Sequence, residues 1–246
     1  MPVNKEAYHN IITELDTRLV TVVAVSKTKS VAEIRELYDL GHRDFGENYV
    51  QEMAEKALQL PKDIRWHFIG HLQRNKVKYI APFVQLIQSV DSLKLLEEIG
   101  RQAKKQGRVI DCLLQVHIAG EETKFGLDED ELNGLISQIN TLQMANVRIL
   151  GLMGMASFTD DMEKVRSEFR QLKILFDRYT KHLPKESIGQ TSPKGVHWTN
   201  LSERSPLDKL QTLSMGMSAD YRVAIEEGSN MLRIGSLIFG ERERNG

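Results

Sequence analysis

Short β-rich runs recur along the whole chain, and most are followed by a stretch with helical spacing. The first run, residues 19–26 (LVTVVAVS), is apolar and β-branched almost throughout, which is typical of a strand buried on both faces. In residues 30–40 the period changes, so that Val31, Ile34 and Leu37 fall on one face of a helix. We predict seven further strands at residues 42–45, 64–69, 86–90, 109–118, 147–153, 213–215 and 231–234. Further helices are predicted at residues 49–58, 75–80, 93–106, 129–139, 162–182 and 219–226.

Eight strands joined by helices within about 250 residues are the elements of an α/β chain folded as a (β/α)8 TIM-type barrel. An open doubly wound sheet would usually have about five to seven strands. The strand count therefore favours the closed barrel, and we expect residues 1–246 to form a single domain. A polar stretch around residues 183–211 predicts a long loop before the seventh strand.

Charge and composition argue against several classes of function. The 33 Lys and Arg residues balance 34 Asp and Glu residues, so no global field attracts nucleic acid or an anionic membrane. No apolar stretch approaches the roughly 18 residues that a membrane span needs. The one cysteine, Cys112, lies in the apolar run VIDCLLQV, where a core thiol is expected, and it cannot form an internal disulfide. We therefore expect a cytoplasmic protein without a nucleic-acid or membrane partner.

Lys27 is the first candidate functional residue. The first predicted strand continues into VAVSKTK, and alternation places Lys27 on the same side as Val23 and Val25. Active sites of barrels lie at the C-terminal ends of the strands. If the two valines fill the barrel interior, Lys27 caps it and loses hydration, which favours a neutral amine able to form a Schiff base. The alternative is an ordinary solvated lysine at a strand end.

A candidate anion site follows the last two strands. The segment LSMGMSAD brings Ser218 to the start of a predicted helix directly after the seventh strand, and Gly235 and Ser236 form the turn after the eighth. Helix N-termini present unpaired amides, and glycine lets an anion approach the backbone. Many barrels hold a phosphate at this place. Asp220 would repel a phosphate if its carboxylate pointed toward it.

Arg233 precedes Gly235 by two residues, so both project to the same side of the eighth strand. Arginine there supplies a fixed cation beside the predicted phosphate turn. The alternative is a structural ion pair with Glu226 or Glu47.

Two further segments hold polar or soft side chains near strand ends. Asn48, in GENYVQE, is placed to cap a helix and to offer its amide to a ligand. In GLMGM, Met153 and Met155 end the sixth strand, as core residues or against a flat ring. His67 and His71 are four residues apart but lie in a strand and turn without the HExxH pattern, so we expect no metal site.

Lysine after the first strand with a phosphate turn after the eighth is the layout of a barrel that holds pyridoxal 5'-phosphate (PLP). The motifs VAVSKTK, FGENYVQE, WHFIGHLQRNK, GEETKFGL, GLMGM, LSMGMSAD and RIGSLIFGER together resemble the pyridoxal phosphate homeostasis protein family, whose members are related to the N-terminal barrel domain of alanine racemase. The resemblance covers nearly the whole chain and implies a fold-type III PLP-binding barrel.

The resemblance also implies roles for individual residues. Lys27 would hold PLP covalently as the internal aldimine, and Arg233 would face the pyridine nitrogen. A cation at that position discourages protonation of the nitrogen and leaves the ring a poorer electron sink. The remaining implied cofactor-binding residues are Ser218, Gly235 and Ser236 at the phosphate and Asn48 and Met153 near the ring.

The function implied is PLP binding in vitamin B6 homeostasis without an established enzymatic reaction, so no catalytic residue is expected. The chain ends about ten residues past the eighth predicted strand, so we expect no second domain like that of the racemases, whose tyrosine is the second acid/base group. We expect a monomer whose partners are PLP and PLP-dependent apo-enzymes.

Two other functions remain open from the sequence. One is a PLP-dependent racemase-like enzyme, with a water or Lys29 replacing the missing base. The other is a class I aldolase-like barrel, in which Lys27 attacks a sugar phosphate directly.

The chain departs from the family pattern at two places. Relatives often have asparagine where this chain has His117, and the segment before the seventh strand is about 20 residues longer than in many relatives.

Overall fold

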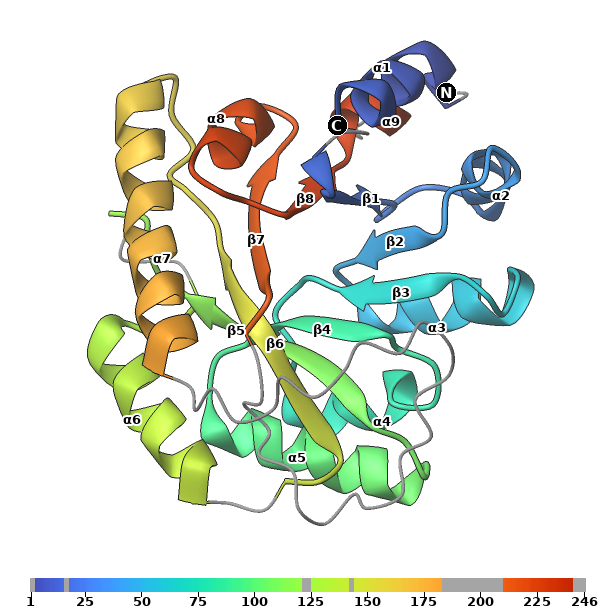
Figure 1. Cartoon of the computed structure of the whole chain (residues 1–246). Helices are drawn as coiled ribbons and strands as arrows, with labels where there is room; N and C mark the ends of the chain where they lie inside the picture. The colour runs from blue at the N-terminus through green and yellow to red at the C-terminus, as the bar shows by residue number, and fades with distance from the viewer. Residues whose placement is uncertain (1–2, 16–17, 121–124, 142–143, 183–209, 241–246) are drawn as a thin grey trace, which may run out of the picture.

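The computed structural model describes residues 3–15, 18–120, 125–141, 144–182 and 210–240. Eight parallel strands close into a barrel in chain order, with β8 paired to β1 (Figure 1). The predicted (β/α)8 barrel is therefore confirmed. The strands are β1 (Thr21–Val25), β2 (Asp44–Glu47), β3 (Arg65–Phe68), β4 (Leu86–Val90), β5 (Ile110–Val116), β6 (Val147–Gly154), β7 (Thr212–Met217) and β8 (Met231–Ile234).

Helices connect the strands on the outside of the barrel (Figure 1). The helix after β1 has a capping box, in which Ser30 Oγ accepts from the Glu33 amide and Glu33 accepts from the Ser30 amide. The helices are α1 (Lys5–Leu15), α2 (Val31–Asp39), α3 (Val50–Gln59), the 3-10 turn η2 (Arg74–Lys76), α4 (Val77–Ile80), α5 (Leu93–Lys105), α6 (Glu129–Thr141), α7 (Met162–His182), α8 (Tyr221–Glu226) and α9 (Ser236–Phe239). The polar segment predicted as a long loop lies outside the described residues except for its last two positions.

The helix α1 precedes the barrel and was not predicted from the sequence. It buries Tyr8, Ile11 and Leu15, whose spacing of three and four residues is the helical signal in this segment. The helix packs against α9, and the Asn4 amide donates to the Ile238 carbonyl at 2.8 Å (Figure 1). The two ends of the described chain therefore lie together.

The position of β2 corrects the sequence-based prediction. The strand was predicted at residues 42–45, but it runs two residues further and includes Gly46 and Glu47. Pairing with β3, in register Gly46 to His67, extends the strand through residues with little intrinsic β propensity. A Cβ on Gly46 would lie 2.9 Å from Val23 Cγ1, so glycine leaves room for the barrel interior.

The barrel has two hydrophobic regions. A small cluster of Val23, Leu86, Leu113, Met153 and Met231 fills part of the interior. A much larger cluster lies between the strands and the surrounding helices, and it includes the buried Cys112. Burial raises the pKa of the Cys112 thiol well above its usual value, which fits the predicted core position.

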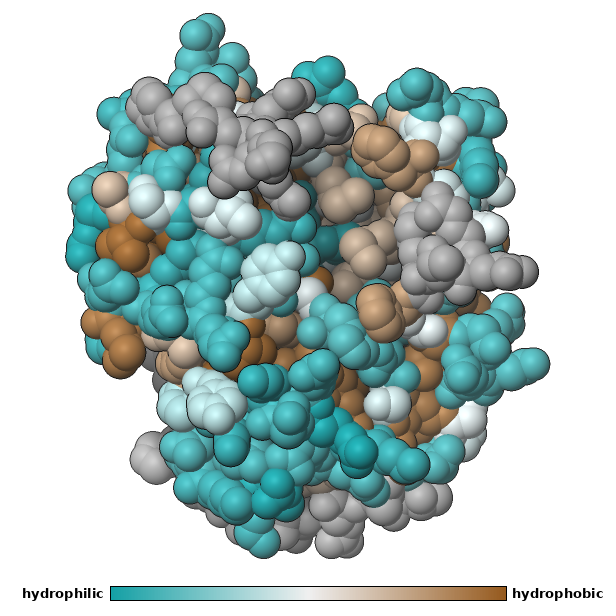
Figure 2. Space-filling model, turned by 180° about the vertical axis from the view of Figure 1, so that it is seen from behind, coloured by the Kyte–Doolittle hydropathy of each residue, from teal (hydrophilic) through white to brown (hydrophobic). Residues whose placement is uncertain are grey.

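The surface seen from behind is largely hydrophilic, with apolar residues showing in separate areas (Figure 2). This is the distribution expected of amphipathic helices packed on a barrel. Within the part of the chain that the structure describes, no helix combines the length and apolarity needed to cross a membrane.

Candidate functional site

A cavity of about 690 Å³ opens at the C-terminal ends of the strands. Six of the seven predicted site residues line it, namely Lys27, Asn48, Ser218, Arg233, Gly235 and Ser236. They follow or end β1, β2, β7 and β8, so the barrel brings together residues from the two ends of the sequence, such as Lys27 and Ser236. This is the end of the barrel where (β/α)8 proteins carry their functional sites.

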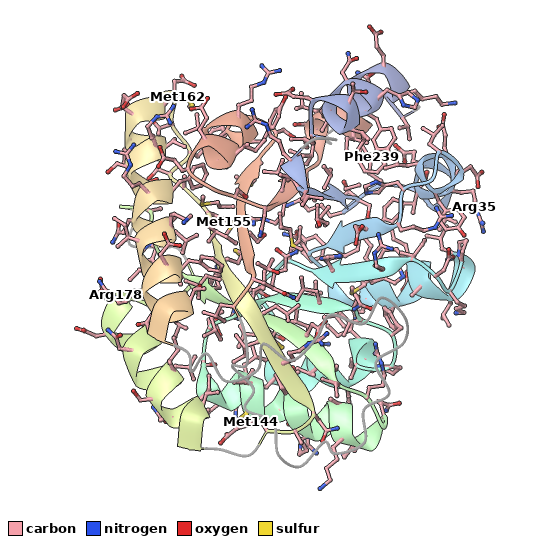
Figure 3. All side chains as sticks on the ribbon, in the orientation of Figure 1. Arg35, Met144, Met155, Met162, Arg178 and Phe239 are labelled. Atoms are coloured by element: carbon pink, nitrogen blue, oxygen red, sulfur yellow. The ribbon has the colours of Figure 1, made fainter. Side chains whose placement is uncertain are left out.

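Met153 is the predicted residue that does not line the cavity. It is completely buried and belongs to the interior cluster with Val23 and Met231. Met155, two residues further along, lies on the cavity wall instead. Met155 and Met162 stand on either side of the β6–α7 connection (Figure 3). That connection, which the sequence analysis did not single out, also contributes Ser157, and Glu168 accepts from both its amide and its hydroxyl at 2.7 Å.

Lys27 occupies the place that strand alternation predicts. Val23 is fully buried in the barrel interior, and Val25 and Lys27 both line the cavity above it. Lys27 is half-buried, in the turn between β1 and α2. Lys27 therefore lies on the cavity wall beside Val25.

Three charged side chains, Glu47, Glu52 and Lys56, hold the turn that carries Lys27, and we call them the turn clamp. Lys56 is buried, and its Nζ donates to the Ser26 carbonyl at 2.8 Å and to both Glu47 and Glu52 Oε1 at 2.7 Å. The residues that flank Lys27 are tied to the same clamp.

Ser26 and Thr28 make those ties on either side of Lys27. The Ser26 hydroxyl donates to Glu47 Oε1 at 2.7 Å, and the Thr28 amide donates to Glu52 Oε1 at 2.6 Å. Thr28 has a φ of 65°, a left-handed conformation that a β-branched residue rarely adopts without support. The clamp therefore fixes the backbone on both sides of the lysine.

Asn48 follows β2 but does not cap a helix, contrary to half of its prediction. The N-cap of α3 is Tyr49, and it makes no side-chain capping bond. Asn48 lines the cavity instead, and its Oδ1, like Glu47 Oε2, is buried without a hydrogen-bond partner in the described part of the chain. Burial also raises the pKa of Glu47, against the opposing effect of Lys56. Because buried polar atoms are nearly always hydrogen-bonded, two unpaired acceptors beside the cavity mark a place where a partner is missing among the described residues.

Arg233 is buried beneath the cavity, with 4% of its surface exposed. Its Nη1 donates to Ser214 Oγ at 2.6 Å and its Nη2 to the Gly154 carbonyl at 2.9 Å. Burial lowers the pKa of Arg233 to about 10, although Asp220 opposes the shift, so the side chain is a cation at neutral pH.

The alternative ion pairs for Arg233 are not formed. Glu226 pairs with Arg166 at 2.6 Å, and Glu47 pairs with Lys56 at 2.7 Å. The acidic residue that acts on Arg233 is instead Asp220, which lines the same cavity.

The turns after β7 and β8 are joined through Ser218. The helix predicted to begin beside Ser218 starts later, at Tyr221, so the serine lies in the connecting turn. The Ser218 hydroxyl accepts from the Gly235 amide at 3.2 Å. The turns after β7 and β8 therefore lie together, as the sequence analysis predicted, and a direct hydrogen bond joins them.

Asp220 lines the same cavity, and its Oδ1 accepts from the Met217 amide at 2.5 Å. Burial raises the pKa of Asp220, against the effects of that hydrogen bond and of Arg233. His117 does not line the cavity, and its amide donates to the Leu127 carbonyl at 2.8 Å.

The fold and the site together define a (β/α)8 barrel of the small-molecule-binding class, with a lysine, a buried arginine and a serine-glycine turn in one cavity. Residues 3–200 match the family model of the alanine racemase N-terminal domain. The chain is 40% identical over 223 residues to the pyridoxal phosphate homeostasis protein of Aquifex aeolicus, covering 90% of this chain and 87% of that protein. It is 37% identical to the human protein of the same name, covering 90% of this chain and 76% of that protein.

A solved structure is similar to this chain over almost its whole length. The structure of PipY from Synechococcus elongatus with PLP bound is similar with a TM-score of 0.77 at 32% identity, covering 96% of this chain and 99% of that one. The chain belongs to the pyridoxal phosphate homeostasis protein family, and the resemblance inferred from its motifs is confirmed.

Proposed function

We propose that this protein binds PLP in the cavity at the C-terminal ends of the strands and acts in vitamin B6 homeostasis. The observation that carries the proposal is the presence of Lys27 and the buried cation of Arg233 in one cavity with the serine-glycine turn. The name of the curated relatives and the PLP bound to PipY support it.

The residues present fit the chemistry of PLP. An aldehyde needs an amine, a phosphate needs donors, and a pyridine nitrogen accepts from a cation. Lys27 would supply the amine for the aldehyde. The Ser218 hydroxyl and Ser236 would supply donors for the phosphate, the Gly235 turn would let it approach the backbone, and Arg233 would be the cation for the ring nitrogen. Asn48, whose Oδ1 has no partner among the described residues, would be available to the bound molecule, and Met155, which lines the cavity, would lie near it in place of the buried Met153.

The same arrangement favours binding over turnover. PLP, when bound, supplies an electron sink for amino-acid carbanions, and that sink is strongest when the ring nitrogen is protonated. Arg233 remains a cation at neutral pH, because its pKa of about 10 is well above 7. A cation facing the nitrogen opposes its protonation and weakens the sink. We therefore propose a non-catalytic PLP carrier formed by one domain, and we keep as predictions its monomeric state, cytoplasmic location and delivery of PLP to apo-enzymes.

The visible absorption spectrum of the purified protein tests this function first. We expect a band from the lysine-bound cofactor that borohydride removes, because reduction of the C=N bond fixes the cofactor to the chain. Amino acids in deuterated solvent should show no exchange of the α-proton. A protein that stays colourless after addition of PLP would contradict the proposal, and catalysed α-proton exchange would favour the racemase-like alternative.

The turn clamp leads to a second prediction. Replacing Glu52 by alanine removes the acceptor of the Thr28 amide and one acceptor of Lys56, so the turn that carries Lys27 loses its fixed position. We expect the affinity for PLP to fall by about tenfold and covalent attachment to slow, because small displacements of a reacting group are costly. Rapid-mixing absorbance with PLP measures both. Glu55→Ala, an exposed site on the same helix, is the control. Equal PLP binding by the two variants would show that the clamp does not position Lys27.

A further inference from the structure

A line of polar side chains crosses the barrel interior from Arg233 to the opposite end of the strands. It consists of Arg233, Ser214, Gln88, His67 and Asp44, and we call it the polar file. All five residues are buried, and Ser214 and Gln88 have no exposed surface. The interior of a (β/α)8 barrel is usually filled by apolar side chains, as it is here around Val23, Leu86, Leu113, Met153 and Met231. A buried polar line in such an interior requires a reason, because each unpaired member would be costly.

The contacts of the file are short and continuous. Arg233 Nη1 lies 2.6 Å from Ser214 Oγ, which lies 2.7 Å from Gln88 Oε1. Gln88 Nε2 is 3.1 Å from His67 Nδ1, and His67 Nε2 is 3.0 Å from Asp44 Oδ1. Each neighbouring pair in the file is therefore within hydrogen-bonding distance.

Arginine can only donate hydrogen bonds, and in the structure the bonds that follow run in the same direction. Ser214 Oγ accepts from Arg233 and donates to Gln88 Oε1. The Nε2 of Gln88 then faces His67 and Met231 Sδ, the latter at 3.3 Å. His67 Nδ1 must accept, so its proton is on Nε2 and is donated to Asp44.

The file ends on an anion that is held in its charged form. Arg65 donates to both carboxylate oxygens of Asp44 at 2.8 and 2.5 Å. Burial alone would raise the pKa of Asp44, but the hydrogen bonds from Arg65 and His67 outweigh it and hold this pKa well below its usual range. A chain of aligned bonds that ends on a carboxylate polarises toward it, which stabilises the cation at the other end.

We propose that Gln88 is a positioning residue that orients Arg233 toward the ring end of the ligand cavity. This inference rests on the proposed PLP site. Among the described residues, the acceptors of Arg233 are Ser214 Oγ and the Gly154 carbonyl. Ser214 is oriented to accept because Gln88 takes its hydroxyl proton. Without Gln88 the hydroxyl rotates, and the guanidinium loses one of the two bonds that fix its plane.

The matched variants are Gln88→Met and Gln102→Met. Methionine approximates the length of glutamine without its hydrogen bonds, and Gln102 is a buried glutamine on α5 whose Nε2 donates to Glu98 at 2.7 Å, away from the cavity. For Gln88→Met we expect about a tenfold loss of PLP affinity, because a hydrogen bond to a charged group is lost. We also expect a shifted visible band and a ring nitrogen that takes up a proton more readily, read from the ¹⁵N shift of labelled PLP. Gln102→Met should keep the wild-type values.

A second readout does not depend on PLP. In the protein without ligand, ¹⁵N NMR of His67 should show a proton on Nε2 in both proteins, because Asp44 accepts from it in both, and a changed Nδ1 shift in Gln88→Met, because Nδ1 loses its bond from Gln88. If Gln88→Met does not fold, Ser214→Ala removes the same acceptor of Arg233 and should cause the same change in the PLP spectrum.

The outcomes separate the two proposals. A wild-type protein that takes up no PLP contradicts the proposed function. PLP binding to Gln88→Met, or to Ser214→Ala in its place, with wild-type affinity and spectrum would overturn the role of Gln88 and leave the proposed function standing.

Discussion

Replacement of Lys27 by alanine is expected to abolish the borohydride-stable attachment of PLP and to weaken its binding by about a hundredfold or more. The physical reason is that the proposed C=N bond to Nζ would make the cofactor part of the chain, which would give a high effective concentration at the remaining contacts. The phosphate turn and Arg233 remain in the variant, so weak, reversible binding should persist. Mass spectrometry after borohydride treatment measures the attachment, and equilibrium dialysis measures the affinity.

Lys29→Ala is the matched control, because Lys29 lines the same cavity. Its Nζ donates to the Phe239 carbonyl at 2.8 Å and lies 3.9 Å from Glu33, so its amine is engaged by the protein. We expect this variant to retain one borohydride-fixed cofactor per chain. Loss of the label in Lys29→Ala with retention in Lys27→Ala would reassign the covalent site to Lys29.

Substitution of Gly70 by alanine is expected to destabilise the protein by about 2–4 kcal/mol and to reduce PLP affinity by about tenfold. Gly70 follows β3, and a Cβ on it would clash with the Asn48 carbonyl oxygen and lie 2.8 Å from Asn48 Cα. Both are backbone atoms, so the clash cannot be relieved by a side-chain rotation. Because Asn48 lines the cavity, the shift that accommodates the methyl group must deform the site. Urea unfolding and PLP titration measure the two effects.

Gly134→Ala is the control for this change. Gly134 lies in α6 with no atom within 4 Å of an added Cβ, so alanine should be neutral or stabilising by up to about 1 kcal/mol through its higher helix propensity. A Gly70→Ala protein with wild-type stability and PLP affinity would show that the Asn48 backbone is not constrained as the structure indicates.

Much of the fold follows from local patterns. The predicted bounds of β4 and β8 coincide with those observed, because each is a short β-rich run that ends in a turn. The error at β2 arose because its last residues, Gly46 and Glu47, are extended through pairing with β3 rather than by their own preference. The helix α1 was missed although Tyr8, Ile11 and Leu15 carry a helical spacing.

The site was less accessible to prediction than the fold. Alternation along β1 correctly placed Lys27 with Val25 on the cavity, because the period of two is a local property of a strand. Along β6 the same period does not say at which residue the interior ends and the cavity begins, so Met153 was selected where Met155 lies on the wall. The unpaired Oδ1 of Asn48 has no signal in the sequence at all.

The sequence by itself therefore determined the order of strands and helices, the closed barrel and the end of the barrel at which the candidate residues gather, because these depend on hydrophobic period and on the geometry of parallel strands. Only the tertiary structure decided how those residues are held. The turn clamp joins Ser26 to Lys56 across 30 positions, and the polar file joins Gln88 to Ser214 across 126. Hydrogen bonds between residues so far apart depend on the three-dimensional approach of their strands and helices, and no local pattern of residues encodes that approach.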